Sequence, residues 1–213
     1  MMMFLYLIEE EMTDRKEIST ILKYKLGYPF AIFSVDTTKI DTWVETLDLD
    51  TFVTDEFTHS LCRTSNGVED NLKINYTPLL EIVGKYVHQY IDEMRPICEI
   101  DCEMEHPWIN IYDYHGFQDC HDHQGLGDND FSWSYVHESG DSSIIFKNRN
   151  ATNSDMNLIH LLDEYKDQFE YVPSKKEKGT LYVFPSSILH AVTPNKSTSQ
   201  RITFTGNVKV NRI

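Results

Sequence analysis

The feature that most constrains this chain is a change of hydrophobic period after residue 100. Residues 108–112 alternate Trp, Asn and Tyr with two Ile residues, which is the two-residue repeat of a β-strand with two different faces. Similar short segments follow at residues 131–137, 142–147, 169–173, 180–185 and 201–210. Turn residues such as Gly140, Asp141 and Gly179 separate them. We expect residues 169–173 and 180–185 to form a hairpin. This pattern predicts many short antiparallel strands.

The N-terminal third has a different pattern. Residues 28–35 predict a strand, after which Asp36 or Thr37 can cap a helix that runs to about Leu47. A stronger helix is expected after Thr77, the proposed cap, with Pro78 as its first residue. Its apolar stripe comprises Leu79, Leu80, Val83, Val87, Tyr90, Ile91 and Met94, and Pro96 ends it. A short helix over residues 154–169 is also expected.

Together these patterns predict a mainly β fold of the α+β class. The core is a jelly roll, also called a double-stranded β-helix, and N-terminal helices support it. We expect one domain over residues 1–213, with a supporting part over 1–100 and a catalytic core over 101–213.

The charge and the cysteine content indicate which binding partners and which cellular compartment to expect. Acidic residues outnumber basic ones by 34 to 19, which argues against nucleic acid as a partner because phosphate contacts need clustered Lys and Arg. The apolar residues 1–8 lack a basic flank and are too short for a bilayer span of ~20 residues. Four cysteines without a secretory signal predict a reduced, cytoplasmic protein that makes no membrane contact.

Three histidines suggest a metal site. His121 and His123, in "CHDHQ", have the spacing that places two imidazoles on one face of a strand. His190 ends the segment "FPSSILH" on a distant strand. Three neutral imidazoles suit Fe(II), Zn(II) or copper, and three protein ligands leave positions open for water or substrate.

Longer motifs carry a family resemblance. The segments "WINIYDYHGFQDCHDH", "FSWSYVH" and "GTLYVFPSSILHAVTPN", followed by "RITFTGN", resemble the 2-oxoglutarate/Fe(II)-dependent oxygenases. They are most similar to a phage and bacterial hydroxylase branch with an H-x-H…H…R pattern, over about residues 105–210. The resemblance implies a dioxygenase that hydroxylates a C–H bond of an unidentified small-molecule or peptidyl substrate and releases succinate and CO2. A phage source, and hence a host cytoplasm, is part of that expectation.

The same resemblance implies roles for individual residues. His121, His123 and His190 are the expected catalytic ligands of Fe(II). Arg201 is expected to bind the distal carboxylate of 2-oxoglutarate, since a guanidinium matches a carboxylate with two parallel hydrogen bonds. A second group is expected to contact the same cosubstrate, and it comprises Thr203, Asn110 and Tyr112.

One position departs from the common pattern. Most of the superfamily has a carboxylate where this chain has His123, and Asp122 alternates to the opposite strand face. A neutral imidazole there leaves the site one charge unit more positive. We expect His123 to be the third ligand, with Asp128 or Asp130 as alternatives.

Other readings of these residues stay open. Asp119 could orient a ligand imidazole through its carboxylate. Cys98 and Cys102, with Cys120 or His106, have a spacing that zinc tolerates, although buried free thiols are the simpler expectation. Two other functions fit the same barrel. One is a cupin-like metalloprotein without 2-oxoglutarate, such as a zinc isomerase or a three-His dioxygenase, and the other is a non-catalytic binding module.

Overall fold

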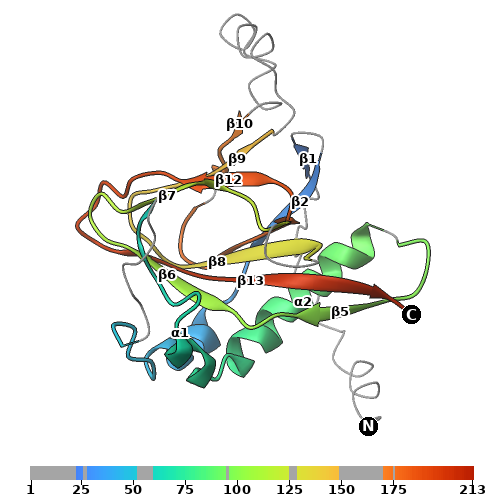
Figure 1. The fold of residues 1–213 in the computed structure, drawn as a ribbon, viewed down its shortest axis with the longest axis horizontal. Coiled ribbons are helices and arrows are strands. Elements are labelled where there is room, and N and C mark those ends of the chain that lie inside the picture. Colours follow the sequence, from blue (N-terminus) through green and yellow to red (C-terminus); the bar gives the residue numbers. More distant parts are fainter. Residues whose placement is uncertain are drawn as a thin grey trace, which may run out of the picture.

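The computed structural model describes residues 23–25, 28–51, 60–94, 96–124, 129–148, 170–174 and 176–213. Two antiparallel sheets face each other, and the helices lie on the outer side of the larger one (Figure 1). The order in the larger sheet is β1 (Lys23–Lys25), β2 (Tyr28–Ser34), β11 (Thr180–Pro185), β8 (Phe131–Ser139), β13 (Arg201–Arg212), β6 (Trp108–Tyr112) and β4 (Arg63–Thr64), with β5 (Ile100–Met104) also beside β13. The order in the smaller sheet is β10 (Glu170–Tyr171), β9 (Ile144–Lys147), β12 (Leu189–Val192), β7 (Phe117–His121) and β3 (Ser60–Leu61).

The chain alternates between the two sheets. From β6 to β9 each strand enters the opposite sheet from the one before it, and β11, β12 and β13 do the same. This alternation winds the chain around a shared interior, which is the double-stranded β-helix form of a jelly roll. The predicted fold class is therefore confirmed.

The helices begin close to their predicted starts. α1 (Thr38–Val44) ends before the expected Leu47, and Asp36 Oδ1 accepts a hydrogen bond from the Thr38 N–H at 3.0 Å. α2 (Thr77–Glu93) follows a short 3-10 helix, η1 (Glu69–Lys73), and has proline in its first turn as predicted. Thr77 is helical rather than the cap, since Tyr76 occupies that position.

The main core lies between α2 and the larger sheet. From α2 the fully buried Leu79, Val83 and Val87 pack in the same cluster as alternate residues of the sheet. These sheet residues are Ile109 and Ile111 of β6, Trp133 and Tyr135 of β8, Leu181 and Val183 of β11, and Ile202 and Phe204 of β13. Each such aliphatic or aromatic burial contributes about 1.5–3 kcal/mol relative to exposure. Because side chains alternate along a strand, the intervening residues of these strands face the interior of the barrel.

The predicted hairpin of residues 169–173 and 180–185 is wrong. β10 pairs with β9 in the smaller sheet, whereas β11 lies between β2 and β8 in the larger sheet. Gly179 has a φ of 82° and turns the chain into the larger sheet, where its carbonyl accepts a hydrogen bond from the Val35 N–H at 2.8 Å. The two segments therefore belong to different layers. The helix expected over residues 154–169 lies outside the described residues.

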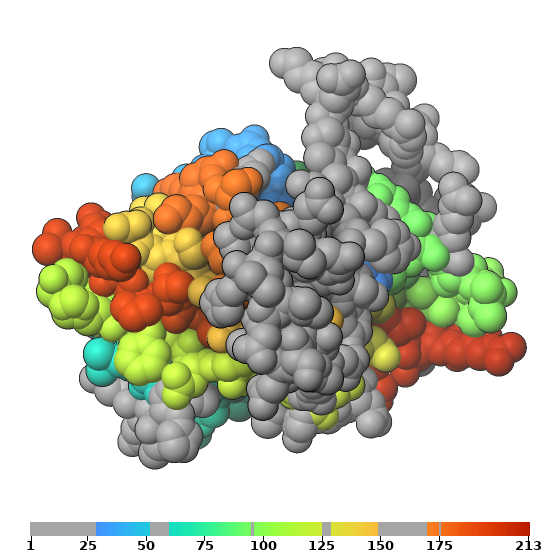
Figure 2. Space-filling model, turned by 90° about the horizontal axis from the view of Figure 1, so that it is seen from above, coloured from blue at the N-terminus to red at the C-terminus, as the bar shows by residue number. Residues whose placement is uncertain are grey.

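Two connections between the sheets lie together at one end of the barrel. Seen from above (Figure 2), the β6–β7 connection and the β12–β13 connection lie at one end, and the C-terminal part of β13 lies at the other. The His115 N–H donates to the Asn195 carbonyl at 2.7 Å, which ties the two connections together. Within the residues that the structure describes, no helix is long and apolar enough to cross a bilayer.

Candidate metal centre

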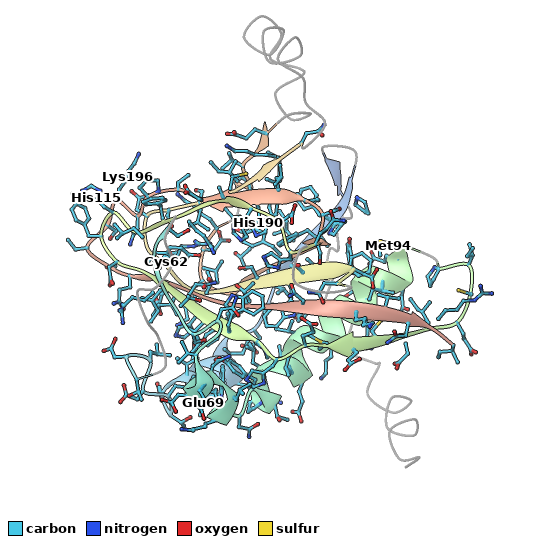
Figure 3. All side chains as sticks on the ribbon, in the orientation of Figure 1. Cys62, Glu69, Met94, His115, His190 and Lys196 are labelled. Atoms are coloured by element: carbon cyan, nitrogen blue, oxygen red, sulfur yellow. The ribbon has the colours of Figure 1, made fainter. Side chains whose placement is uncertain are left out.

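The three histidines singled out from the sequence converge between the two sheets. His190 on β12 is the Cα partner of His121, the last residue of β7, and it projects into the space between the layers (Figure 3). The ring centroids of His121 and His190 are 4.3 Å apart, and that of His123 lies 5.0 Å from His190. His123 is not on the same strand as expected. β7 ends at His121, and the chain then bends so that the His123 N–H donates to the Ser186 carbonyl at 3.0 Å.

Hydrogen bonds orient all three imidazoles in the same way. Each Nδ1 lies beside a carbonyl-type oxygen: Asp119 O for His121 (2.7 Å), Asn207 Oδ1 for His123 (2.7 Å) and Ile188 O for His190 (3.1 Å). Such oxygens only accept, so each Nδ1 carries a proton and each Nε2 keeps its lone pair. The expected role of Asp119 is thus filled by its backbone carbonyl, not by its carboxylate.

The donor set fits a divalent transition metal. One potential ligand atom from each histidine lies within 4.8 Å of the others, and in the described part of the chain no other group of His, Cys, Asp or Glu has this arrangement. Burial lowers the pKa of all three imidazoles and brings that of His123 to about 4, so the lone pairs are available at pH 7. Neutral imidazoles bind Fe(II), Zn(II) and copper.

All seven predicted site residues line one cavity of about 370 Å³, a volume that includes its open mouth. Among the described lining residues, Arg201 is the one with a full charge at neutral pH, which makes the cavity attractive to an anion. The sequence did not single out Gln118 or Phe184, which line the cavity as well. The two-residue alternation of a strand does not predict that Gln118 faces inward together with His121, three residues later. Its side chain turns inward because of a β-bulge between β7 and β12.

The guanidinium of Arg201 is buried and incompletely paired. The residue is 1% exposed, its Nη1 reaches the Ser139 carbonyl only at 3.5 Å, and its Nε has no partner among the described residues. Burial lowers the pKa of Arg201, whereas the nearby Tyr182 and Tyr112 raise it. A buried cation with a free N–H is a site for a carboxylate, since an unpaired charge is costly to keep out of water.

Asn110 and Tyr112 are held in fixed orientations beside this arginine. Thr64 Oγ1 donates to Asn110 Oδ1 at 2.7 Å, and Asn110 Nδ2 donates to Thr205 Oγ1 at 3.4 Å. Tyr112 is the Cα partner of Arg201, and its hydroxyl donates to Gln118 Oε1 at 2.7 Å. Burial raises the pKa of Tyr112, so the side chain stays a neutral phenol. The cavity therefore presents fixed, uncharged polar groups next to one cation.

One of the two alternative ligands is engaged elsewhere. Asp130 Oδ2 accepts a hydrogen bond from the Val210 N–H at 2.8 Å, and Asp128 lies outside the described residues. None of the four cysteines forms a disulfide, and His106 Nε2 lies 2.9 Å from the Asn71 carbonyl oxygen. Cys98 and Cys102 thus form no metal cluster among the residues described.

Solved structures share the fold at low sequence identity. A prolyl-4-hydroxylase from Pseudomonas putida is 11% identical with a TM-score of 0.52, over 85% of this chain and 92% of that protein. A prolyl hydroxylase from Trichoplax adhaerens, in complex with a hypoxia inducible factor oxygen degradation domain peptide fragment, is 11% identical with a TM-score of 0.56, over 84% and 83%. A viral collagen prolyl hydroxylase from Paramecium Bursaria Chlorella virus-1, solved with 2OG, is 10% identical with a TM-score of 0.52, over 84% and 94%. No curated protein sequence matches the chain.

The chain therefore shares the jelly-roll fold of these hydroxylases. Residues 106–207 match the family described as "Putative 2OG-Fe(II) oxygenase". The match confirms the resemblance drawn from the motifs, and the description of that family names Fe(II) and 2-oxoglutarate, the expected cofactors.

Proposed function

We propose that His121, His123 and His190 hold Fe(II) through their Nε2 atoms and that the protein hydroxylates a C–H bond of its substrate. The observation that carries this proposal is the shared orientation of the three imidazoles, whose Nδ1 protons all point to acceptors. The arrangement leaves three lone pairs for one metal, and among the described residues no Cys, Asp or Glu joins this group.

Arg201 is proposed to bind the distal carboxylate of 2-oxoglutarate. Its buried Nε and Nη groups offer the two parallel hydrogen bonds that a carboxylate accepts. Thr203 lies on the same face of β13 and lines the same cavity, so its hydroxyl can add a third hydrogen bond. Asn110 and Tyr112, held rigid by their own partners, shape the wall against which the cosubstrate packs.

When bound, Fe(II) and 2-oxoglutarate supply the oxidation, in which O2 and 2-oxoglutarate are consumed and succinate, CO2 and hydroxylated substrate are formed. The protein's own contribution is orientation and exclusion of water. Ile144, Phe184 and Val192 give the cavity an apolar wall beside the histidines. With no carboxylate among its described lining residues, the cavity carries net positive charge and favours a dianionic cosubstrate.

The substrate is proposed to be peptidyl or a small molecule. The structurally similar proteins include prolyl hydroxylases, one of them in complex with a peptide fragment. A cupin-like metalloprotein without 2-oxoglutarate would have no use for the buried, partly unpaired guanidinium of Arg201. That cation favours the oxygenase over this alternative.

The test is an anaerobic titration of metal-free protein with Fe(II) and 2-oxoglutarate. A visible metal-to-ligand charge-transfer band should form with wild type and weaken in Arg201→Met and in His123→Ala. Bound iron without a band would support the cupin-like alternative. A band that survives His123→Ala would show that another residue supplies the third ligand.

A further inference from the structure

Behind His123 a line of hydrogen bonds leads out of the barrel to a carboxylate. The Nδ1 of His123 lies 2.7 Å from Asn207 Oδ1, and the same amide's Nδ2 donates to Glu105 Oε2 at 3.2 Å. The Glu105 N–H also donates to the Asn207 carbonyl at 3.0 Å. Glu105 therefore contacts Asn207 at two points, one through its backbone and one through its side chain.

This support differs from that of the other two histidines. His121 and His190 bond to backbone carbonyls, whose orientation the strands and their connections fix. His123 instead bonds to a side-chain amide, and an amide can rotate to present either its oxygen or its nitrogen. If the nitrogen faced His123, the imidazole would have to accept at Nδ1 and carry its proton at Nε2, where the metal must bind.

Among the described neighbours of the Asn207 amide, only the Glu105 carboxylate can fix which way the amide faces. Ser132 Oγ lies 2.9 Å from Asn207 Oδ1 and 3.0 Å from His123 Nδ1, but a hydroxyl can donate or accept. Asn129 is itself an amide, and its nitrogen must face Glu105 Oε1, at 2.9 Å, so that its oxygen accepts from Asn207 Nδ2 at 3.0 Å. The carboxylate of Glu105 only accepts, so it draws both amide nitrogens toward itself.

We infer that Glu105 is a positioning residue which, through Asn207, keeps the proton of His123 on Nδ1 and so leaves its Nε2 free for the metal. This inference rests on the proposed role of His123 as a ligand. It assigns a function in the metal site to the carboxylate of an exposed residue that is not among those lining the cavity.

The test reads the tautomer of His123 directly. Long-range proton–nitrogen NMR of the metal-free full chain, with ¹⁵N-labelled histidine, distinguishes Nδ1–H from Nε2–H. Wild type should show Nδ1–H at His123. Glu105→Leu removes the acceptor and should give a mixture of tautomers, with Co(II) affinity reduced roughly 10–100-fold, the range found for partners behind metal ligands.

Two further variants separate this role from general effects of charge and folding. Glu105→Gln removes the charge but keeps one acceptor oxygen, so it should retain more of the Nδ1–H form and more of the affinity than Glu105→Leu. Glu103→Leu makes the same change at an exposed position of β5, two residues before Glu105 and opposite Lys209, and should match wild type. Because Glu105 is also exposed, we expect all three variants to fold.

Three results would overturn the inference. They are an unchanged tautomer and Co(II) affinity in Glu105→Leu, an equal loss in Glu103→Leu, and a loss in Glu105→Gln as large as that in the leucine variant. The NMR measurement needs no metal, so it stays informative if the protein binds no iron. A wild type with Nδ1–H at His123 that binds no Fe(II) would instead refute the proposed function alone.

Discussion

Arg201→Met should change ligand binding and stability in opposite directions. In the absence of 2-oxoglutarate the buried guanidinium has one N–H without a described partner and one long hydrogen bond. Methionine fills similar volume without a charge to desolvate, so we expect the free energy of unfolding to rise by roughly 1–3 kcal/mol. For a chain of this size that is roughly 2–4 °C in Tm per kcal/mol.

The same change should remove most of the affinity for 2-oxoglutarate. A hydrogen bond between charged groups contributes roughly 1.5–3 kcal/mol, so the loss of two such bonds weakens binding at least about 100-fold. At a ligand concentration of about 100 times the wild-type Kd, wild type gains about 2.7 kcal/mol of stability. The variant, then near its own Kd, gains only about 0.4 kcal/mol.

The assay is urea unfolding of Zn(II)-loaded protein with and without 2-oxoglutarate. The control is Arg212→Met, the same substitution at an exposed position of the same strand, which should stay within about 0.5 kcal/mol of wild type in both conditions. The reasoning would be refuted if Arg201→Met lost stability without ligand and still gained the full increment with it.

Three further predictions concern His190, the pair Cys98 and Cys102, and His137. His190→Ala should lower metal affinity by more than roughly 100-fold, which exceeds the loss caused by removing a residue behind a metal ligand. If a chelator competition gave this variant the affinity of wild type, His190 would not be a ligand. Cys98→Ala/Cys102→Ala should leave the bound metal unchanged by elemental analysis, because these thiols lie outside the histidine cluster; a lost equivalent would point to a second metal. Burial, aided by Lys178, holds the pKa of His137 below 6.5, so the unfolded chain takes up a proton below that pH before the folded protein does. The free energy of unfolding should therefore fall as the pH drops below 6.5. In urea titrations, His137→Phe should lessen this fall by at most about 1.4 kcal/mol per pH unit. The argument is wrong if the free energy of unfolding depends on pH in the same way in the variant and in wild type.

Local pattern was enough for several of the elements and for the faces of individual strands and helices. The alternation along residues 108–112 correctly placed Asn110 and Tyr112 on the inner face of β6, opposite the isoleucines that pack under the helices. The apolar stripe of α2 likewise identified its buried face. Both depend on periodicity within one element, which sequence alone displays.

Features that depend on register between distant strands were not predictable. Gln118 faces the cavity because a bulge shifts β7 against β12, and no local pattern marks that bulge. Asn207 meets His123 only because β13 runs beside β8 in one particular register. The hairpin prediction failed for a related reason, since sequence proximity says nothing about which sheet a strand enters.

β13 has a consequence for the way the chain folds. It is the last described strand in the sequence, yet it lies between β8 and β6 and pairs with β5 as well. Its residues supply one wall of the cavity and part of the main core. During synthesis, β6 and β8 therefore emerge without the strand that will join them, and the sheet can close only once residues 201–208 have left the ribosome. Folding should be late and slow, as expected when pairings distant in sequence dominate, and exposed strand edges before that moment make the nascent chain a candidate for chaperone capture.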